Sequence, residues 1–369
     1  MKFYIISGEA SGDLHGSNLM LALRRKFSQV EFRCWGGDKM EAAGGTLVKH
    51  YSDLAFMGFK EVIQNLPEIL GNIRLCKKDI TAYRPDAIIL VDYPGFNLRI
   101  AEWGKKNGYR IIYYISPQVW AWKENRVKMM KKCIDLMLVI LPFEQKFFRE
   151  KWNWDVDYVG HPLVEVIKAF DPKITDFSNK PVVALLPGSR KQEIRKHLSI
   201  MLEVAGRFPG HHFIVAMAPG QTKDFYSRFL KEHNNVSAVG GLTYDLLKAS
   251  KAAIVTSGTA TLETALLKVP EFVGYKTSNM SYQIARKLVK IKYISLVNLI
   301  MDKPVVKELI QQDFNASAMT NELSNLLNNP VRRHQMLNDY DELENVLSAG
   351  GHASDNAAEK IKDFLGKRP

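Results

Sequence analysis

The sequence predicts an α/β protein of two doubly wound, Rossmann-like domains that face a cleft, and two observations lead to this fold class. The chain has 369 residues, more than one hydrophobic core usually fills, so two domains are expected. Short, nearly continuous apolar runs alternate with amphipathic stretches, as in parallel sheets covered by helices on both faces. Ligands of such folds bind outside the carboxyl ends of the strands. The expected strands span residues 3–7, 32–35, 87–92, 110–115, 136–141, 156–160, 182–186, 213–216, 236–239, 253–256 and 272–274.

A polar segment divides the chain near its middle. The string DPKITDFSNKP, at residues 171–181, has a proline near each end and is followed by a new apolar strand. We therefore expect domains over 1–170 and 171–340. A helical tail is expected over 341–369, and it could pack back on the first domain.

The overall charge indicates an anionic partner. Apolar residues make up 46% of the chain and charged residues 24%, as in ordinary globular proteins, and the formal net charge is +12. Basic chains commonly bind nucleic acid, anionic membrane surfaces or phosphorylated substrates. No RNP, KH, zinc-finger or helix-turn-helix signature is visible in the sequence, which disfavours nucleic acid. A membrane surface and a phosphorylated substrate remain.

The cysteines and the apolar segments indicate a cytoplasmic protein. The three cysteines, Cys34, Cys76 and Cys133, form no CxxC pair, which favours a reducing compartment. The opening MKFYII is too short for a signal peptide. The apolar run at 136–143 is far shorter than the ~18–20 residues that a transmembrane helix needs.

The sharpest motif is LPGSRKQEI, in which a buried strand leads through a small-residue turn into a helix. The N–H groups of Gly188 and Ser189 and the dipole of the helix that follows would attract an anion. Arg190 would clamp a phosphate, and Glu193 lies in the first turn of the helix. The alternative is a plain strand-to-helix turn with a solvated arginine.

A second turn of the same kind occurs in TSGTATLE. Small residues open its helix and allow close backbone approach to a diphosphate, whereas Glu263 could accept hydrogen bonds from ribose hydroxyls. Simple helix capping is the alternative for this turn alone. Two such turns in one domain favour a nucleoside diphosphate. The small residues are Ser257, Gly258, Thr259 and Ala260.

The opening loop, GEASGD, is better suited to hydroxyl groups than to phosphate. It lacks the G-x-G-x-x-G fingerprint and a Walker lysine, and Glu9 and Asp13 would repel a pyrophosphate. We expect Glu9, Ser11 and Asp13 to line an acceptor site. A glycine turn with helix-capping acids is the alternative.

Asp92 ends a buried strand in AIILVDYPGFN, where a carboxylate would point into the cleft and act as general base. The alternative is an aspartate that caps the turn after it.

Two further stretches could contact lipid. Trp120, Trp122 and Arg126 belong to a tryptophan-containing loop that leads into a basic helix, for which packing and a solvated face are the alternatives. A helical stripe over 58–73 would by its pattern alone be core, and it could instead contact acyl chains. Its residues include Phe59, Val62, Ile63, Leu66, Ile69 and Leu70.

Taken together, eight strings make the chain closely similar to the lipid-A-disaccharide synthase family over nearly its whole length. The resemblance implies a metal-independent, inverting glycosyltransferase of GT-B architecture that needs no cofactor. It implies UDP-2,3-diacylglucosamine as donor and 2,3-diacylglucosamine 1-phosphate (lipid X) as acceptor. It also implies peripheral binding to the cytoplasmic face of a Gram-negative inner membrane, which favours the membrane interpretation of the 58–73 stripe; a homodimer is possible. The strings are SGEASGDLHG, FMGFKEVI, VDYPGFN, YYISPQVWAW, YVGHPL, LPGSRKQEI, TSGTATLE and YISLVNLI.

The resemblance also implies roles for single residues. Glu9 and Asp92 match acidic positions of the family's active site, and Arg190 matches its phosphate-binding arginine. Asn298 matches an asparagine near the donor, and Glu263 matches the acid expected at the ribose. Many relatives have a second aspartate where this chain has Gly95, so another acid could be the base in them.

The expected chemistry follows from these positions. Asp92 would take the proton from the acceptor 6-hydroxyl as that oxygen attacks the anomeric carbon, while UDP leaves toward Arg190 and the two turns. A UDP-sugar epimerase of the same architecture is the nearest alternative. A non-catalytic module that binds anionic lipid or RNA is a third.

Overall fold

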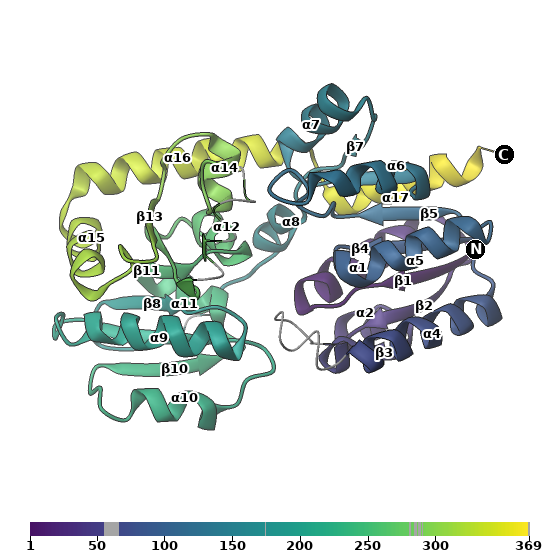
Figure 1. The fold of residues 1–369 in the computed structure, drawn as a ribbon. Coiled ribbons are helices and arrows are strands. Elements are labelled where there is room, and N and C mark those ends of the chain that lie inside the picture. The colour runs from purple at the N-terminus through teal and green to yellow at the C-terminus, as the bar shows by residue number, and fades with distance from the viewer. Residues whose placement is uncertain are drawn as a thin grey trace. The chain divides into compact units, whose positions relative to one another are not determined.

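The computed structural model describes residues 1–54, 66–173, 175–279, 282, 283, 286, 289 and 291–367. The chain divides into two compact units, Met1–Pro162 with Leu347–Pro369 and Leu163–Val346, each built on its own parallel sheet (Figure 1). The predicted α/β class with two parallel sheets is therefore confirmed. Of the 58–73 stripe, Phe59, Val62 and Ile63 and the side chain of Leu66 lie outside the described residues.

Unit 1 contains a seven-stranded parallel sheet in the order β3-β2-β1-β4-β5-β6-β7. The order reverses between β1 and β4, the point at which doubly wound sheets bind ligands. The strands are β1 (Lys2–Ile6), β2 (Glu31–Gly36), β3 (Thr46–His50), β4 (Ala87–Val91), β5 (Ile111–Tyr114), β6 (Leu136–Val139) and β7 (Asp157–Tyr158).

Helices cover both faces of this sheet because successive side chains of each buried strand point to opposite faces. Phe3 and Ile5 of β1 join a core cluster with residues of α1 and α17, whereas Tyr4 and Ile6 join a cluster with residues of α4, α5 and α6. The helical segments of this unit are α1 (Ala10–Lys26), α2 (Asp38–Ala42), η1 (Tyr51–Leu54), α4 (Leu66–Tyr83), α5 (Pro94–Lys106), η2 (Glu124–Arg126), α6 (Val127–Cys133), α7 (Pro142–Trp152) and α17 (Ala353–Gly366).

The C-terminal helix α17 packs against α1. Arg25 of α1 forms an ion pair of 2.6 Å with Asp355 of α17, and Ile361 is fully buried in the core cluster that also contains Leu19. The last helix of the chain thus completes the core of the unit that the first strand begins.

Unit 2 contains a six-stranded parallel sheet in the order β10-β9-β8-β11-β12-β13, which reverses between β8 and β11. Its strands are β8 (Val182–Leu186), β9 (His212–Met217), β10 (Val236–Gly240), β11 (Ser250–Thr256), β12 (Glu271–Tyr275) and β13 (Lys307–Ile310). Its helices include α8 (Pro162–Lys168), α9 (Lys191–Ala205), α10 (Lys223–Leu230), α11 (Thr243–Ala249), α12 (Thr259–Leu266), α14 (Leu296–Met301), α15 (Ala316–Asn328) and α16 (Pro330–Ser348).

Two edge strands, β3 and β13, were not expected from the sequence. Their strings, TLVKH and KELI, mix charged and apolar residues because an edge strand is only partly covered. The run expected at 156–160 forms only the two-residue strand β7. Among the described helices, none is both long enough and apolar enough to cross a bilayer.

Candidate active site

The first candidate group lies at the carboxyl ends of β1 and β4 in unit 1. Asp92 and Tyr93 follow β4, and both have left-handed backbone conformations, with φ of +46° and +47°. Two consecutive non-glycine residues in this region are strained, and such strain persists only where the surroundings enforce it.

Three hydrogen bonds enforce this conformation through the backbone of Asp92. Its N–H donates to the carbonyl of Tyr114 (3.1 Å), and its carbonyl accepts from Asn97 Nδ2 (2.8 Å) and from the Tyr113 hydroxyl (2.6 Å). Asn97 is fully buried, and its Nδ2 also lies 3.2 Å from the carbonyl oxygen of Val91. Asn97 is the last residue of the string AIILVDYPGFN, but nothing in the sequence indicated that it would hold the backbone of Asp92.

The environment of Asp92 suits a base that acts near neutral pH. Burial raises the pKa of the Asp92 carboxyl to about 7, and the nearby charge of Glu9 acts in the same direction. Glu9 is half-buried at the N-cap position of α1. The preceding residue, Gly8, lies against the ring of Tyr93, and a Cβ on Gly8 would come within 2.4 Å of the ring carbons. The loops after β1 and β4 therefore bring the two predicted acids together.

A third acid, Glu144, stands nearby and was not predicted. Its carboxylate accepts from the Leu141 N–H (3.0 Å) and from Trp120 Nε1 (3.1 Å). Burial raises the pKa of Glu144 to about 7, and the charge of Asp92 adds to that shift. Trp120, which belongs to the tryptophan-containing loop expected to contact lipid, is thus held in position by a buried carboxyl group.

Asp13 has a structural role in the same unit. It is 3% exposed, and its carboxylate accepts from the N–H groups of Gly37 (2.8 Å), Lys39 (3.1 Å) and Met40 (3.0 Å), at the start of α2. Ser11 is exposed on α1.

The predicted lipid-contacting residues differ in exposure. Trp122 is 44% exposed, and the cations of Lys123 and Arg126 lie 4.3 and 5.8 Å from its ring centroid. Leu70 is 43% exposed, whereas Ile69 packs against the core. The described part of the stripe is therefore partly core and partly surface.

The second candidate group lies at the carboxyl ends of β8 and β11 in unit 2. Gly188 has φ +109°, and a Cβ there would come within 3.1 Å of Glu193 Oε2. Arg190 is the N-cap residue of α9, but its side chain makes no capping hydrogen bond to the helix backbone. Its Nη1 lies 3.3 Å from Glu193 Oε1. Ser189 and Arg190 are exposed. The start of α9 thus presents backbone N–H groups beside a cation.

The start of α12 repeats this arrangement. Gly258 is its N-cap, with φ +154° and no side-chain cap, and both Gly258 and Thr259 are exposed, whereas Ala260 is half-buried. Ser257 donates from its hydroxyl to the carbonyl of Ile294 (2.8 Å). A Cβ on Gly188 would lie 3.8 Å from Thr256 Cγ2, so the two turns are neighbours. Two helix N-termini without side-chain caps at one sheet edge offer free backbone N–H groups and the positive ends of two helix dipoles, which favour an anion there.

Glu263 lies one turn into α12. Its Oε1 accepts a hydrogen bond of 2.7 Å from the Tyr244 hydroxyl, and burial raises the pKa of Glu263. Tyr244, on α11, was not predicted from the sequence.

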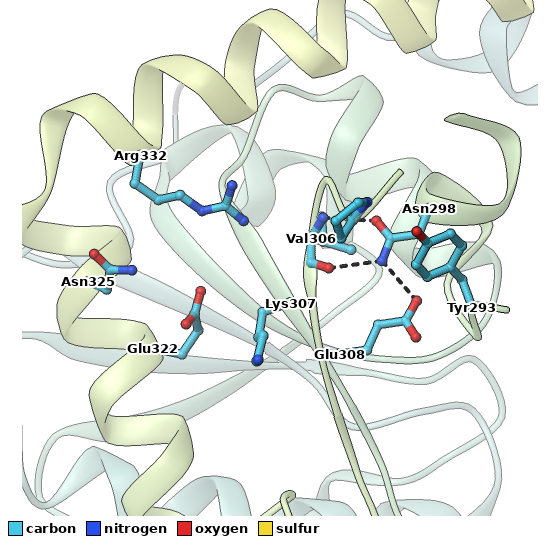
Figure 2. Close-up of a pocket in the computed structure, with 9 residues that line it drawn as sticks. Tyr293, Asn298, Val306, Lys307, Glu308, Glu322, Asn325 and Arg332 are labelled. Carbon is cyan, nitrogen blue, oxygen red and sulfur yellow. Dashed lines mark hydrogen bonds between the residues drawn. The ribbon is translucent and has the colours of Figure 1, made fainter. Parts of the chain in front are cut away.

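Asn298 uses its amide within the fold. Its Nδ2 donates to the Val306 carbonyl and to Glu308 Oε1 (both 2.9 Å), as Figure 2 shows, and its Oδ1 accepts from the Val306 N–H. Glu308 also accepts from the N–H of Ile294, whose carbonyl receives the Ser257 hydroxyl. Asn298 therefore braces the segment against which the second turn rests. It lines a pocket of about 370 Å³ together with Tyr293, Pro304, Val306, Lys307, Glu308, Glu322, Asn325 and Arg332.

Comparison with known proteins identifies the family. The family model described as lipid-A-disaccharide synthetase matches residues 3–362. The chain belongs to this family. It is 39% identical over 361 residues to a lipid-A-disaccharide synthase of Syntrophus aciditrophicus, covering 95% of this chain and 94% of that protein. It is 38% identical over 363 residues to lipid-A-disaccharide synthase 1 of Legionella pneumophila, covering 94% of each. The family resemblance inferred from the eight strings is confirmed.

Solved structures with low sequence identity share the fold. The chain superposes with a TM-score of 0.64 on a UDP-GlcNAc 2-epimerase from Neisseria meningitidis bound to UDP-GlcNAc, at 13% identity with full coverage of both chains. The TM-score is 0.62 for a spinosyn rhamnosyltransferase, at 12% identity with coverage of 98% of this chain and 99% of that one. The architecture is the two-sheet GT-B fold of glycosyltransferases and related epimerases.

Proposed function

We propose that the chain transfers an acylated glucosamine from UDP-2,3-diacylglucosamine to the 6-hydroxyl of 2,3-diacylglucosamine 1-phosphate (lipid X). The products are the β-1,6-linked lipid A disaccharide 1-phosphate and UDP. The observation that carries this proposal is the family match over residues 3–362. The acidic edge of unit 1 and the anion-binding edge of unit 2 supply groups suited to that chemistry.

In this mechanism Asp92 is the general base. It accepts the proton of the acceptor 6-hydroxyl while that oxygen forms a bond to the anomeric carbon and the bond to the UDP oxygen breaks. A single displacement of this kind inverts the anomeric centre. A base with a pKa of about 7 is well matched to proton transfer near neutral pH.

The leaving diphosphate is stabilised by unit 2. Arg190 and the N–H groups of Ser189 and Thr259 meet the growing negative charge, and preorganised donors of this type contribute about 3 kcal/mol each in other enzymes. These groups supply positive charge where other transferases use a metal ion. Glu263, held on one oxygen by Tyr244, accepts from a ribose hydroxyl with the other.

In this proposal the enzyme binds to the cytoplasmic face of the inner membrane, because both of its substrates carry acyl chains. The exposed Trp122, with Lys123 and Arg126 beside its ring, suits an interface where an aromatic ring meets anionic head groups. The exposed Leu70 would contact acyl chains.

The test is an assay of UDP release by the purified chain. The donor is supplied with and without the acylated glucosamine 1-phosphate acceptor, each with and without EDTA. Acceptor-dependent release of UDP that is insensitive to EDTA, with the disaccharide phosphate detected by mass spectrometry, supports the proposal. Conversion of the donor in the absence of acceptor would instead indicate an epimerase. No turnover, together with salt-sensitive binding to a polyanion, would indicate a binding module.

A further inference from the structure

His197, which no motif singled out, connects the ends of three neighbouring strands in unit 2. It lies on α9 and is fully buried. Its Nδ1 is 3.2 Å from the Pro187 carbonyl oxygen after β8 and 3.2 Å from Thr256 Oγ1 at the end of β11. Its Nε2 is 3.1 Å from the backbone nitrogen and 3.0 Å from the carbonyl oxygen of Lys276, just beyond β12.

Both ring nitrogens lie within hydrogen-bond distance of groups at strand ends. Each nitrogen faces a backbone carbonyl oxygen, Nδ1 that of Pro187 and Nε2 that of Lys276, so either nitrogen donates when it carries the proton. The other nitrogen then accepts, Nε2 from the Lys276 N–H or Nδ1 from the Thr256 hydroxyl. In either neutral tautomer the ring therefore links two strand ends.

The surroundings keep the ring neutral. Burial lowers the pKa of His197, although its hydrogen bonds with Lys276 and Pro187 act in the opposite direction; the charges of Glu193 and Lys196 on its own helix oppose each other. The ring of Phe314 packs edge-on at 5.6 Å between centroids, and that of Tyr275 lies at 5.9 Å. A neutral ring keeps one of its two nitrogens as an acceptor.

The position of this link matters for anion binding. The first phosphate-type turn begins at Pro187, and the second begins directly after Thr256. A ligand held by N–H groups from both turns requires a fixed spacing between them, and an error of about 1 Å in such a site is costly. An apolar side chain could fill the same volume, but it would not fix the direction of either strand end.

We propose that His197 is a positioning residue that holds the two phosphate-binding turns in register for the nucleoside diphosphate of the donor. This inference rests on the proposed function, because it assumes that UDP binds at those turns. His197 itself does not touch the diphosphate; it acts through the backbone of Pro187 and through Thr256.

The test is calorimetric titration of UDP into the full-length chain and its variants. His197→Phe keeps a ring of similar size but removes both hydrogen bonds, and it should raise the Kd for UDP by roughly tenfold or more. His197→Asn keeps a donor that can reach the Pro187 carbonyl and should show an intermediate Kd. In turnover assays the KM for donor should rise while the KM for acceptor stays unchanged.

A matched control separates positioning from stability. Met201 lies one turn further along α9 and is also fully buried, so Met201→Ala should lower the melting temperature without changing the Kd for UDP. If His197→Phe does not fold, His197→Asn and His197→Gln each retain one link, and at least one should bind UDP threefold or more weakly.

Three results would overturn the inference. His197→Phe that folds and binds UDP as tightly as the wild type would exclude a positioning role. So would wild-type affinity in both the Asn and the Gln variants. Absence of UDP binding by the wild-type chain would instead refute the donor site of the proposed function, and the inference with it.

Discussion

The carboxyl edges of the two sheets occupy the same place in a doubly wound fold, yet they carry opposite chemistry. In unit 1 the loops after β1 and β4 bring Glu9 and Asp92 together, with a strained backbone at Asp92 and Tyr93. In unit 2 the turns after β8 and β11 present helix N-termini without side-chain caps, with Arg190 at one of them. The fold determines where a ligand can bind. The side chains at the carboxyl edge decide whether that edge accepts a proton from the ligand or holds an anion.

The largest effect should come from removing the base. Asp92→Asn should lower kcat by about a thousandfold or more, because a positioned general base contributes on the order of 10² to 10⁴. The same variant should bind UDP with wild-type affinity, because the change lies in the acidic edge alone. Turnover assays and UDP titration on one protein preparation measure both.

A control variant and the pH dependence of kcat/KM test this prediction further. Asp86 stands at the opposite end of β4, where it accepts from the Lys2 N–H, so Asp86→Asn should leave turnover unchanged. In the wild type kcat/KM should fall about tenfold per pH unit below about 7, as Asp92 becomes protonated. A flat profile, or normal turnover by Asp92→Asn, would show that another group is the base.

The next effect concerns the strain at the acidic edge. Asn97→Ala removes the side chain that hydrogen-bonds to the Asp92 carbonyl. Without this bond the backbone of Asp92 can leave its left-handed conformation, which stores about 1–3 kcal/mol of strain. We expect kcat to fall roughly 10- to 100-fold while UDP affinity is retained. The side-chain amide of Asn107, at the other end of α5, donates to the Trp103 carbonyl and lies away from Asp92, so Asn107→Ala serves as control. Equal turnover of the two variants would contradict the role of Asn97.

Substitutions at the carboxyl edge of unit 2 should weaken UDP binding, whereas those in unit 1 should leave it unchanged. Arg190→Ala should raise the Kd for UDP by roughly 10- to 150-fold, because charge-assisted hydrogen bonds contribute about 1.5–3 kcal/mol. Turnover should also fall as the leaving group loses a cation. Arg195→Ala removes an exposed cation from the same helix and should leave the Kd unchanged. Unaltered UDP affinity in Arg190→Ala would refute its assignment.

The smallest effect is expected at the amino edge of unit 2, where β12 begins with Glu271. This carboxyl is fully buried, neither of its oxygens has a hydrogen-bond partner in the described part of the chain, and burial raises its pKa well above the ordinary value. The folded state therefore binds a proton that the unfolded state releases, and stability falls as pH rises above about 4.5.

Glu271→Gln should remove this pH dependence. The variant should be more stable than the wild type by about 1–3 kcal/mol at pH 8 and by less at pH 5, with turnover unchanged. Urea unfolding at both pH values measures the difference. A constant difference between the two pH values would show that Glu271 does not titrate with folding.

The sequence predicted most of both sheets because buried parallel strands are continuous apolar runs. It also located Gly188, Arg190, Glu9 and Asp92 just after the carboxyl ends of strands, where the structure has them, and their roles stay predictions. It did not predict β3 and β13, whose partial exposure permits charged residues.

The supporting residues could not be predicted in the same way. Asn97 and His197 bond to backbone atoms of segments that are distant in sequence, and Tyr244 reaches Glu263 from another helix. Such contacts depend on the packed fold rather than on any local pattern. The sequence treated Asp13 as a ligand-binding acid, whereas in the structure its carboxylate accepts hydrogen bonds from three backbone N–H groups.

The most direct test of the contrast between the two edges is hydrogen–deuterium exchange of the full-length chain with and without UDP. We predict slower exchange on UDP addition in peptides covering 187–194 and 256–263, with no change over 8–13 and 92–97. Protection over 8–13 and 92–97 with none over the two unit 2 turns would contradict it, because the nucleotide would then bind at the acidic edge.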